Sequence, residues 1–534
     1  MCEAAASPVG QNASGTYSQS ELRRDISVWG SYMWGYADIG ADIYTALGIV
    51  ALAALGLTPL AFLLAGSVYA MVGLCYAELA AAYPVAGGGQ YFTLRGLGDA
   101  FSLLGGSALL LDYIIDISLF TLIAFGYLNY FLPFLTFGHT IQDFVLVVGP
   151  AHVQWLWMLE TLAGIAILIW LNYLGIHISS LINEILGVLT MAAQSIIVIA
   201  GFVLVWRPEM LVHQFVFHRP TLGQFAFGTS LAIISFVGLE SISQVAQETR
   251  RPATIIPRTT IGLVLSVLIF AISFSVLATG MIDPSAFRGH EGDPVALVAG
   301  KIPIIGAIAA PLTALIGGIV VYISANSGVV SVSRLTYSMS QFQVLPAWFN
   351  RVHPRYQTPT RTIVVFSLAA AVVTIFAFVF PGKSGGNAAI DILADLYAFG
   401  ATYGYLLVLI SLLVLRFRDP YTPRPYLMPL NIRIRFRGRP VRFPVLAVVG
   451  MISMLFFLVM VIATHGYARV AGPVWIVFAF LFYIVYRRRR RLPVLGTVRR
   501  DWDSITRQVL KSAEEWKSLE EYEAAIRDGT RLSG

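Results

Sequence analysis

Long apolar stretches separated by short polar segments run along most of the chain. A helix that crosses the hydrocarbon core of a bilayer needs about 20 apolar residues. Twelve stretches approach or exceed that length, and none contains Lys or Arg: 26–53, 59–83, 101–131, 155–175, 181–206, 224–248, 259–282, 305–333, 362–380, 389–415, 443–464 and 471–486. The first is no cleavable signal peptide, because a polar leader precedes it and more spans follow. The pattern predicts an all-α integral membrane protein with twelve transmembrane helices.

The composition excludes several other classes of protein. Of the 534 residues, 57% are hydrophobic and 12% are charged, whereas about 25% of the residues of a soluble protein are charged. The two cysteines, Cys2 and Cys75, cannot form the framework of a secreted disulfide-rich protein. No nucleophile–base pair or metal-ligand motif indicates an enzyme, since the eight histidines are scattered. A soluble enzyme and a disordered scaffold are therefore not expected.

Basic residues are distributed unevenly between the loops on the two sides of the predicted membrane. With the N-terminus inside, 30 of the 36 Lys and Arg residues fall on the inner side. This bias predicts cytoplasmic N- and C-termini in a multi-pass protein of the plasma (inner) membrane. The net charge of +7 is therefore attributed to topology, and no nucleic-acid partner is expected. The run of five arginines from Arg487 to Arg491 follows the last span and is a candidate contact for anionic lipid.

The same pattern divides the chain into five regions. We expect a disordered cytoplasmic leader at 1–25, a ten-helix core at 26–415 and a basic cytoplasmic loop at 416–442. Helices 11 and 12 follow at 443–486, and a basic, mixed-charge cytoplasmic tail occupies 487–534. Charges of both signs at helical spacing predict a short solvated helix in this tail.

Spans 1 and 6 contain residues that are poor choices for a continuous helix in lipid. Span 1 has Gly40 between Asp38 and Asp42, and span 6 has Gly238 two residues before Glu240. Each glycine alone is typical of helix packing. Two interruptions at matching positions, each beside an acid, favour the broken helices of inverted-repeat folds. The half-helix ends at a break offer N–H groups to a carboxylate and carbonyls to a cation.

Acidic residues lie inside the spans without basic residues to match them. They are Asp38, Asp42, Glu78, Asp112, Asp116, Glu160, Glu184, Glu240, Asp391 and Asp395. An unpaired charge at this depth costs several kcal/mol, so such acids are hypotheses of function. Asp112 and Asp116 are four residues apart and share one helix face, which suits proton or cation binding. Glu78 and Glu184 lie near cytoplasmic ends, where a gate or surface pair is expected instead.

Five segments carry a resemblance to a known family. They are Gly40-Ala41-Asp42-Ile43; Glu78-Leu79-Ala80 with Pro84, Ala86-Gly87-Gly88 and Tyr91; Phe236-Val237-Gly238-Leu239-Glu240-Ser241 with Glu248, Arg251-Pro252 and Ile256-Pro257-Arg258; Ser324-Ala325-Asn326-Ser327-Gly328 with Ser333-Arg334, Tyr337-Ser338-Met339 and Leu345-Pro346 to His353-Pro354; and Leu393-Ala394-Asp395-Leu396 with Phe399-Gly400. Together they resemble the amino acid–polyamine–organocation (APC) permease superfamily over 26–415. The resemblance implies a LeuT-like core of five plus five inverted-repeat helices, with helices 1 and 6 broken, and two extra helices.

The resemblance also implies an activity. We expect a secondary active transporter, a permease for an amino acid or organic amine that works by alternating access and is coupled to protons or another cation as a symporter. The implied substrate-binding residues are Asp38, Ile39, Gly40, Ala41, Asp42, Tyr44, Phe236, Val237, Gly238 and Glu240. The implied ion- or proton-coupling residues are Asp112, Tyr113, Asp116, Thr190, Ser324 and Tyr397. No cofactor is expected beyond the coupling ion.

Two positions depart from the family pattern. Asp42 stands where the family has Gly, and Thr190 stands where proton-coupled members often have Lys. A carboxylate at position 42 favours a cationic group over a substrate carboxylate. The sequence therefore leaves the nature of the substrate open.

The sequence leaves alternative functions open. Asp38-Ile39-Gly40, Leu111-Asp112-Tyr113 and Leu396-Tyr397-Ala398 resemble segments of the potassium-uptake branch of the superfamily. The alternative substrate is therefore potassium, coordinated by Asp38, Asp112, Tyr113 and Tyr397. A non-transporting nutrient receptor would need a signalling domain larger than the short tail, and an ion channel would usually show a selectivity-filter sequence.

Overall fold

The computed structural model describes residues 27–85, 87–148, 151–174, 180–244, 246, 249, 251–353, 356, 358–380, 388–419, 421–436 and 439–529. The predicted leader at 1–25 lies outside these residues. So do three positions of the family motifs, Ala86, Glu248 and Pro354.

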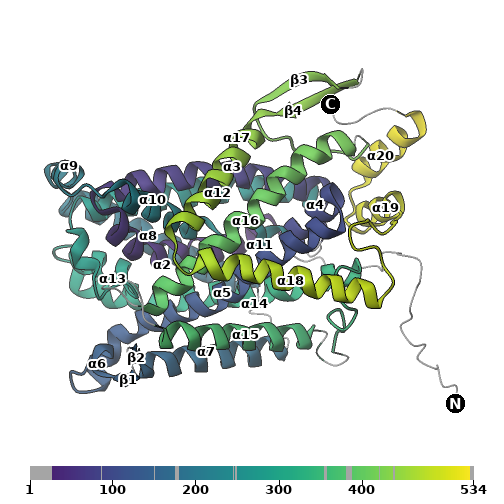
Figure 1. Cartoon of the computed structure of the whole chain (residues 1–534). Helices are drawn as coiled ribbons and strands as arrows, with labels where there is room; N and C mark the ends of the chain where they lie inside the picture. The colour runs from purple at the N-terminus through teal and green to yellow at the C-terminus, as the bar shows by residue number, and fades with distance from the viewer. Residues whose placement is uncertain are drawn as a thin grey trace, which may run out of the picture.

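The described chain is dominated by helices that cross the body of the protein (Figure 1). Eleven helical segments are long and apolar enough to span a membrane, and together they cover the twelve predicted spans. The crossing helices are α1 (Val28–Ile39), α2 (Asp42–Ala54), α3 (Thr58–Ala82), α5 (Asp99–Leu128), α7 (Trp155–Tyr173), α8 (Ser180–Leu204), α10 (Leu222–Leu231) with α11 (Glu240–Gln244), α12 (Pro252–Thr279), α14 (Gly306–Gln341), α15 (Thr360–Val379), α16 (Ala388–Arg418), α17 (Val445–Thr464) and α18 (Ala468–Arg489).

The first of the eleven segments, Val28–Ala82, contains two predicted spans. At about 1.5 Å per residue, its 55 residues are far too long for one crossing of a core of about 30 Å. The chain reverses at η1 (Leu55–Leu57), where Leu55 adopts a φ of 48°. The helices α1 and α2 therefore form span 1, and α3 forms span 2.

The shorter elements connect the crossing helices. They are α4 (Gly88–Leu97), η2 (Asn129–Phe131), α6 (Leu132–Leu135), η3 (Ile141–Asp143), β1 (Val145–Val148), β2 (Ala151–Gln154), α9 (Pro208–Phe217), η4 (Ala232–Phe236), η5 (Pro284–Phe287), α13 (Pro294–Gly300), β3 (Asn431–Phe436), β4 (Arg439–Pro444), α19 (Trp502–Ser512) and α20 (Trp516–Asp528). The strands form two antiparallel hairpins, with Val145 opposite Gln154 and Asn431 opposite Pro444. The sequence pattern did not predict these hairpins, which lie in loops outside the helical core.

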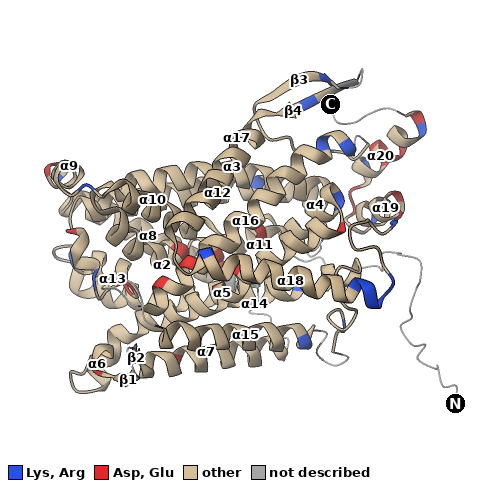
Figure 2. Ribbon diagram, viewed as in Figure 1, with Lys and Arg blue, Asp and Glu red and all other residues tan. Residues whose placement is uncertain are grey.

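The connecting elements gather at two ends of the body (Figure 1). One end, on the right of the view, carries α4, the β3–β4 hairpin, α19 and α20; the other carries α6, α9, α13 and the β1–β2 hairpin. Most of the Lys and Arg residues lie toward the first end (Figure 2), which we call the basic end. The loops predicted to be cytoplasmic therefore lie together.

Acids at the basic end are held by arginines. Glu78 accepts hydrogen bonds from Arg416 Nη2 (2.5 Å) and Arg424 Nη1 (3.1 Å). Asp99 is bound by Arg487 Nη2 (2.5 Å) and Arg500 Nη1 (2.6 Å). These buried pairs fix the ends of spans 2, 3, 10 and 12 to one another, because breaking one would leave an uncompensated buried charge.

Asp419 is a third acid held by arginine, just beyond the end of α16. Its Oδ2 lies 2.6 Å from Arg95 Nη2 and accepts a bond from the Tyr83 hydroxyl at 3.0 Å. Burial alone would raise the pKa of the Asp419 carboxyl, but the Arg95 guanidinium and the hydrogen bonds to the carboxyl outweigh burial and lower that pKa below its ordinary value.

The C-terminal tail differs from the prediction of a short solvated helix. It forms two helices, α19 and α20, and α19 buries Ile505, Val509 and Leu510. The guanidinium of Arg95 lies over the Trp502 ring, with its central carbon 4.8 Å from the ring centroid. The prediction of a solvated helix was wrong because apolar residues at helical spacing give this tail a buried face.

Candidate transport site

The predicted break in span 1 is a two-residue turn. Helix α1 ends at Ile39 and α2 begins at Asp42, with Gly40 and Ala41 between them. Backbone bonds run from Gly40 N–H to the Tyr36 carbonyl (2.9 Å) and from Ala41 N–H to the Asp38 carbonyl (3.3 Å). A Cβ at position 40 would lie 2.4 Å from the Tyr36 carbonyl oxygen, so only Gly fits this turn without a shift of the backbone.

A glutamine from span 5 holds the same turn. Gln194 Nε2 donates to the Gly40 carbonyl at 2.8 Å, and Gln194 Oε1 accepts a bond from the Tyr36 hydroxyl at 2.5 Å. Thr190, the predicted coupling residue, lies one turn earlier and donates to the Leu186 carbonyl of its own helix at 2.7 Å. Sequence reasoning missed Gln194, although its amide lies four residues from Thr190 and therefore on the same helix face.

The break in span 6 lies directly against the break in span 1. The 3₁₀ segment η4 ends at Phe236, and α11 begins at Glu240. Gly238, between them, has a φ of +105°, and a Cβ there would lie 3.0 Å from Asp38 Oδ2. Gly238 is needed because L side chains rarely adopt this φ and because the Asp38 carboxylate leaves no room. The structure thus brings Asp38 and Gly238 together as the matching breaks predicted.

Two carboxylates at the breaks accept bonds from hydroxyl groups. Asp38 Oδ1 accepts from Ser324 Oγ at 3.1 Å and from Ser327 Oγ. Glu240 Oε2 accepts from the Tyr405 hydroxyl at 2.5 Å. The Tyr405 hydroxyl in turn accepts a bond from Gly238 N–H at 3.2 Å, so Tyr405 ties span 10 to the break in span 6.

Other carboxyl oxygens at the centre have no partner among the described residues. They are Asp42 Oδ2, Glu240 Oε1 and both oxygens of Asp112. All three side chains are at most 1% exposed. The carboxyls of Asp38, Asp112, Asp116 and Glu240 all interact electrostatically with that of Asp42. A buried carboxylate without a donor is costly, so this group is suited to hold protons or a cation.

The remaining predicted coupling residues surround this group. The Tyr397 hydroxyl donates to Asp116 Oδ1 at 3.4 Å, and the Tyr113 hydroxyl accepts from Gln244 Nε2 at 3.1 Å. Asp116 approaches span 8 closely because Gly328 has no side chain: a Cβ there would lie 2.3 Å from Asp116 Oδ2.

The acids predicted inside the spans divide into two groups. Glu78 has two arginine partners, and Asp395 Oδ1 lies 2.8 Å from His465 Nδ1. A pair was expected for Glu78 at its cytoplasmic end, although the two arginines bury it and do not leave it at the surface. The expectation that Asp395 lacks a basic partner was wrong, because His465 reaches it from beyond the predicted span limits. The central carboxyls have hydroxyl groups as hydrogen-bond partners, or none, within the described part of the chain.

The aromatic residues predicted for the site close it on two sides. The Phe236 ring packs on Tyr69 with ring centroids 5.1 Å apart, beside a cavity of about 10 Å³ that Tyr405 also lines. A second cavity of about 10 Å³ is lined by Tyr36, Gly40 and Gln194. Each is about the size of one water probe. The predicted site residues Ile39, Ala41 and Val237 are all buried. The Tyr44 carbonyl accepts a bond from the Tyr127 hydroxyl at 2.9 Å. The site is therefore closed in this conformation.

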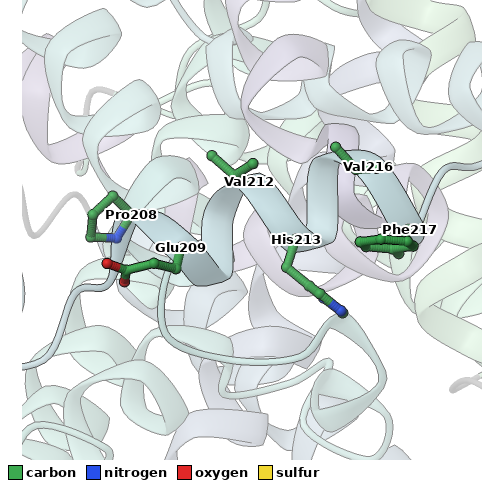
Figure 3. Close-up of a pocket in the computed structure, with 6 residues that line it drawn as sticks. All are labelled: Pro208, Glu209, Val212, His213, Val216 and Phe217. Carbon is green, nitrogen blue, oxygen red and sulfur yellow. The ribbon is translucent and has the colours of Figure 1, made fainter.

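A larger surface pocket, of about 480 Å³, lies away from the breaks. Its six lining side chains all come from the short helix α9 (Figure 3). The pocket contains none of the central carboxyls, so it is separate from the candidate site.

Comparison with known proteins agrees with this geometry. Residues 26–486 match a family model described as "Amino acid permease". The branched-chain amino acid permease BcaP of Bacillus subtilis is 27% identical over 486 residues, which cover 89% of this chain and 95% of BcaP. The methylthioribose transporter of the same organism is 25% identical over 85% of this chain and 91% of its own length. Cationic amino acid transporter 4 of Mus musculus is 26% identical over 76% of this chain and 62% of its own length.

Proposed function

The chain belongs to the amino acid permease family, and on that premise we propose that it moves an amino acid or organic amine across the plasma membrane by alternating access. The protein is a multi-pass membrane transporter and not an enzyme. The substrate would bind between the breaks of spans 1 and 6. The single observation that carries this assignment is that both breaks lie beside buried carboxyl oxygens for which the described residues provide no hydrogen-bond donor.

The chemistry of the breaks suits a molecule with an ammonium group. Asp42 and Asp112 offer carboxyl oxygens to that group, and the carbonyls near Ile39 and Phe236 add the partial negative charge of helix C-termini. The carboxylate of an amino acid would meet the N–H groups of the turn at Gly40 and Ala41. Those groups bond local carbonyls in the closed conformation, so the substrate would compete with the turn itself.

Alternating access would move spans 1, 2, 6 and 7 against the other helices. Several bonds cross that boundary at the site, among them those of Tyr405 in span 10 to Glu240 and Gly238 in span 6. Asp38 in span 1 bonds Ser324 and Ser327 in span 8, and Gly40 in span 1 bonds Gln194 in span 5. These are the contacts that opening would break.

Coupling would use the same carboxyls. Asp112 and Glu240 come from different spans and both carry oxygens without donors, so a proton or cation between them would lower the cost of bringing them together. Asp116, bonded by Tyr397, is a third carrier. Symport of protons with the substrate is the coupling that this arrangement supports best.

The basic end would face the cytoplasm, with both termini inside, as the charge bias predicts. Within the run from Arg487 to Arg491, Arg487 is fully buried against Asp99. Contact with anionic lipid is therefore proposed for Arg488 to Arg491, whose side chains are exposed.

The test is uptake into proteoliposomes with labelled amino acids, polyamines and rubidium. Uptake of an amino acid or amine driven by an imposed proton gradient is the expected result. Rubidium uptake without uptake of any amino acid or amine would overturn the proposal in favour of the potassium alternative. Binding without uptake of any compound would indicate a receptor.

A further inference from the structure

The end opposite the basic end contains a second cavity, distinct from the closed site at the breaks. Its volume is about 640 Å³, within the usual range for small-molecule sites. The walls come from the end of α5 with η2 and α6, from η3, from the start of α7 and from the loop before α13. They include Tyr130, Trp157, Arg288, His290 and Glu291. We call this cavity the vestibule.

Two glycines bring the walls of the vestibule together. A Cβ on Gly126 would lie 2.8 Å from Trp157 Cζ2 and 2.9 Å from the Gly292 carbonyl oxygen. The Trp157 ring is fixed by a bond from Nε1 to the Leu122 carbonyl at 2.8 Å. The loop therefore lies directly against span 3, and its charged residues are held at a rigid aromatic wall.

The charged groups of the vestibule are only partly satisfied. Glu291 is 5% exposed; its Oε2 accepts a bond from Gly289 N–H at 3.0 Å, whereas its Oε1 has no partner among the described residues. Asp293 is already paired with His290, because its Oδ1 lies 2.9 Å from His290 Nδ1. Arg288 lines the cavity with an exposed side chain, and no described carboxylate forms an ion pair with it. One guanidinium and one carboxyl oxygen thus remain for a ligand.

We propose that the vestibule is a second binding site for a zwitterionic amino acid, occupied before the molecule reaches the breaks. Arg288 binds the ligand carboxylate, because a guanidinium matches a carboxylate in geometry and charge. Glu291 receives the ammonium group, and Trp157 and Tyr130 pack against the ligand side chain. This inference rests on the proposed function, since it takes its ligand class from the transported substrate.

A chain of hydrogen bonds connects the vestibule to the transport site. Val295 N–H, two residues after Asp293, donates to the Tyr127 hydroxyl at 3.2 Å, and that hydroxyl donates to the Tyr44 carbonyl at 2.9 Å. Pro294 also contacts α2: its Cβ would lie 3.1 Å from a Cβ at Gly48. A ligand bound by Glu291 would therefore be connected, through the loop before α13, to α2, which is the segment of span 1 that follows the break.

The test counts binding sites on the full-length protein in detergent, with labelled L-leucine and L-arginine as probes in equilibrium dialysis. For the amino acid that is taken up into proteoliposomes, two molecules are expected to bind each chain. Arg288→Gln and Glu291→Gln should each remove one of the two sites. Arg288→Gln should also raise the KM of uptake about tenfold with little change in the maximal rate, as expected for loss of one charged hydrogen bond.

The matched control is Arg219→Gln, which removes an exposed guanidinium outside the vestibule. It should leave both the number of sites and the KM unchanged. Arg288 is exposed, so its variant tests the inference even where Glu291→Gln folds poorly. Uptake with one bound molecule per chain, or with two that both persist in Arg288→Gln, would overturn the vestibule site and leave the proposed function intact. Absence of both uptake and binding would overturn both.

Discussion

Buried acids at the basic end and buried acids at the centre are the same residue types with opposite surroundings. Glu78 and Asp99 are each bound by two arginines. Asp42 and Asp112 are equally buried, yet Asp112 has no partner for either oxygen among the described residues. The first group has its charge neutralised permanently by the protein. The second has its charge left for a proton, a cation or a substrate to neutralise.

The difference separates structural acids from functional ones. An acid that is paired with arginine stabilises one arrangement of helices, because either partner alone would be a buried charge. An acid whose only hydrogen-bond partners are hydroxyl groups, or that has no partner, is free to change its partner during a transport cycle.

The largest expected effect is on stability at the basic end. Glu78→Gln removes the charge that neutralises Arg416 and Arg424, so the free energy of unfolding should fall by about 3–5 kcal/mol. Denaturant titration of the purified protein in detergent measures this loss.

The control for that variant is Glu160→Gln. Glu160 has an amide partner, Asn129 Nδ2 at 3.0 Å, so the change should cost about 1 kcal/mol or less. Equal losses in the two variants would contradict the structural role given to the arginine pairs.

A smaller effect is expected when the Tyr405 hydroxyl, which bonds a central carboxyl, is removed. Tyr405→Phe removes the donor to Glu240 and the acceptor for Gly238 N–H. Uptake should fall about tenfold, equivalent to about 1.4 kcal/mol, while the melting temperature stays close to that of the unaltered protein. Tyr403→Phe, on the same helix, is the control and should transport normally. If Tyr405→Phe lowered stability without lowering uptake, Tyr405 would belong with the structural group.

The smallest effect concerns the pH dependence of stability at the basic end. Arg95 holds the pKa of Asp419 below its ordinary value in the folded protein. The stability gained from the pair is therefore complete above the unfolded value of about 3.9 and is lost as the pH falls through the lower folded value. The difference in melting temperature between the unaltered protein and Asp419→Asn should shrink as the pH is lowered from about 4 through the folded pKa. A constant difference over that range would contradict the assigned shift.

Much of the fold follows from the sequence. Apolar length sets the crossing helices, because the bilayer demands it. The reversal at Leu55 and the turn at Gly40 were both predicted as boundaries from the spacing of apolar and breaking residues. The loop hairpins were not, since strand pairing depends on packing contacts more than on local pattern. The buried face of the tail was missed although its apolar residues lie at helical spacing.

The residues of the candidate site could be predicted from the sequence, but their hydrogen-bond and ion-pair partners could not. The matched breaks at Gly40 and Gly238 carry a local signal that sequence reasoning can detect. The partners of each acid come from far along the chain: Arg416 is 338 residues from Glu78, and Ser327 is 289 residues from Asp38. Depth in the span separated Glu78 from Asp112 in the sequence, but sequence alone could not name the arginines that neutralise Glu78.

The most direct measurement of the central claim is uptake by Asp112→Asn in proteoliposomes. The variant keeps the shape of the side chain and removes the charge that no described residue neutralises. The account predicts that uptake of the transported amino acid falls about tenfold or more, that its dependence on an imposed proton gradient weakens, and that elution profile and melting temperature do not change. Unchanged uptake with unchanged gradient dependence would contradict the claim that the unpartnered central carboxyls carry the transport chemistry.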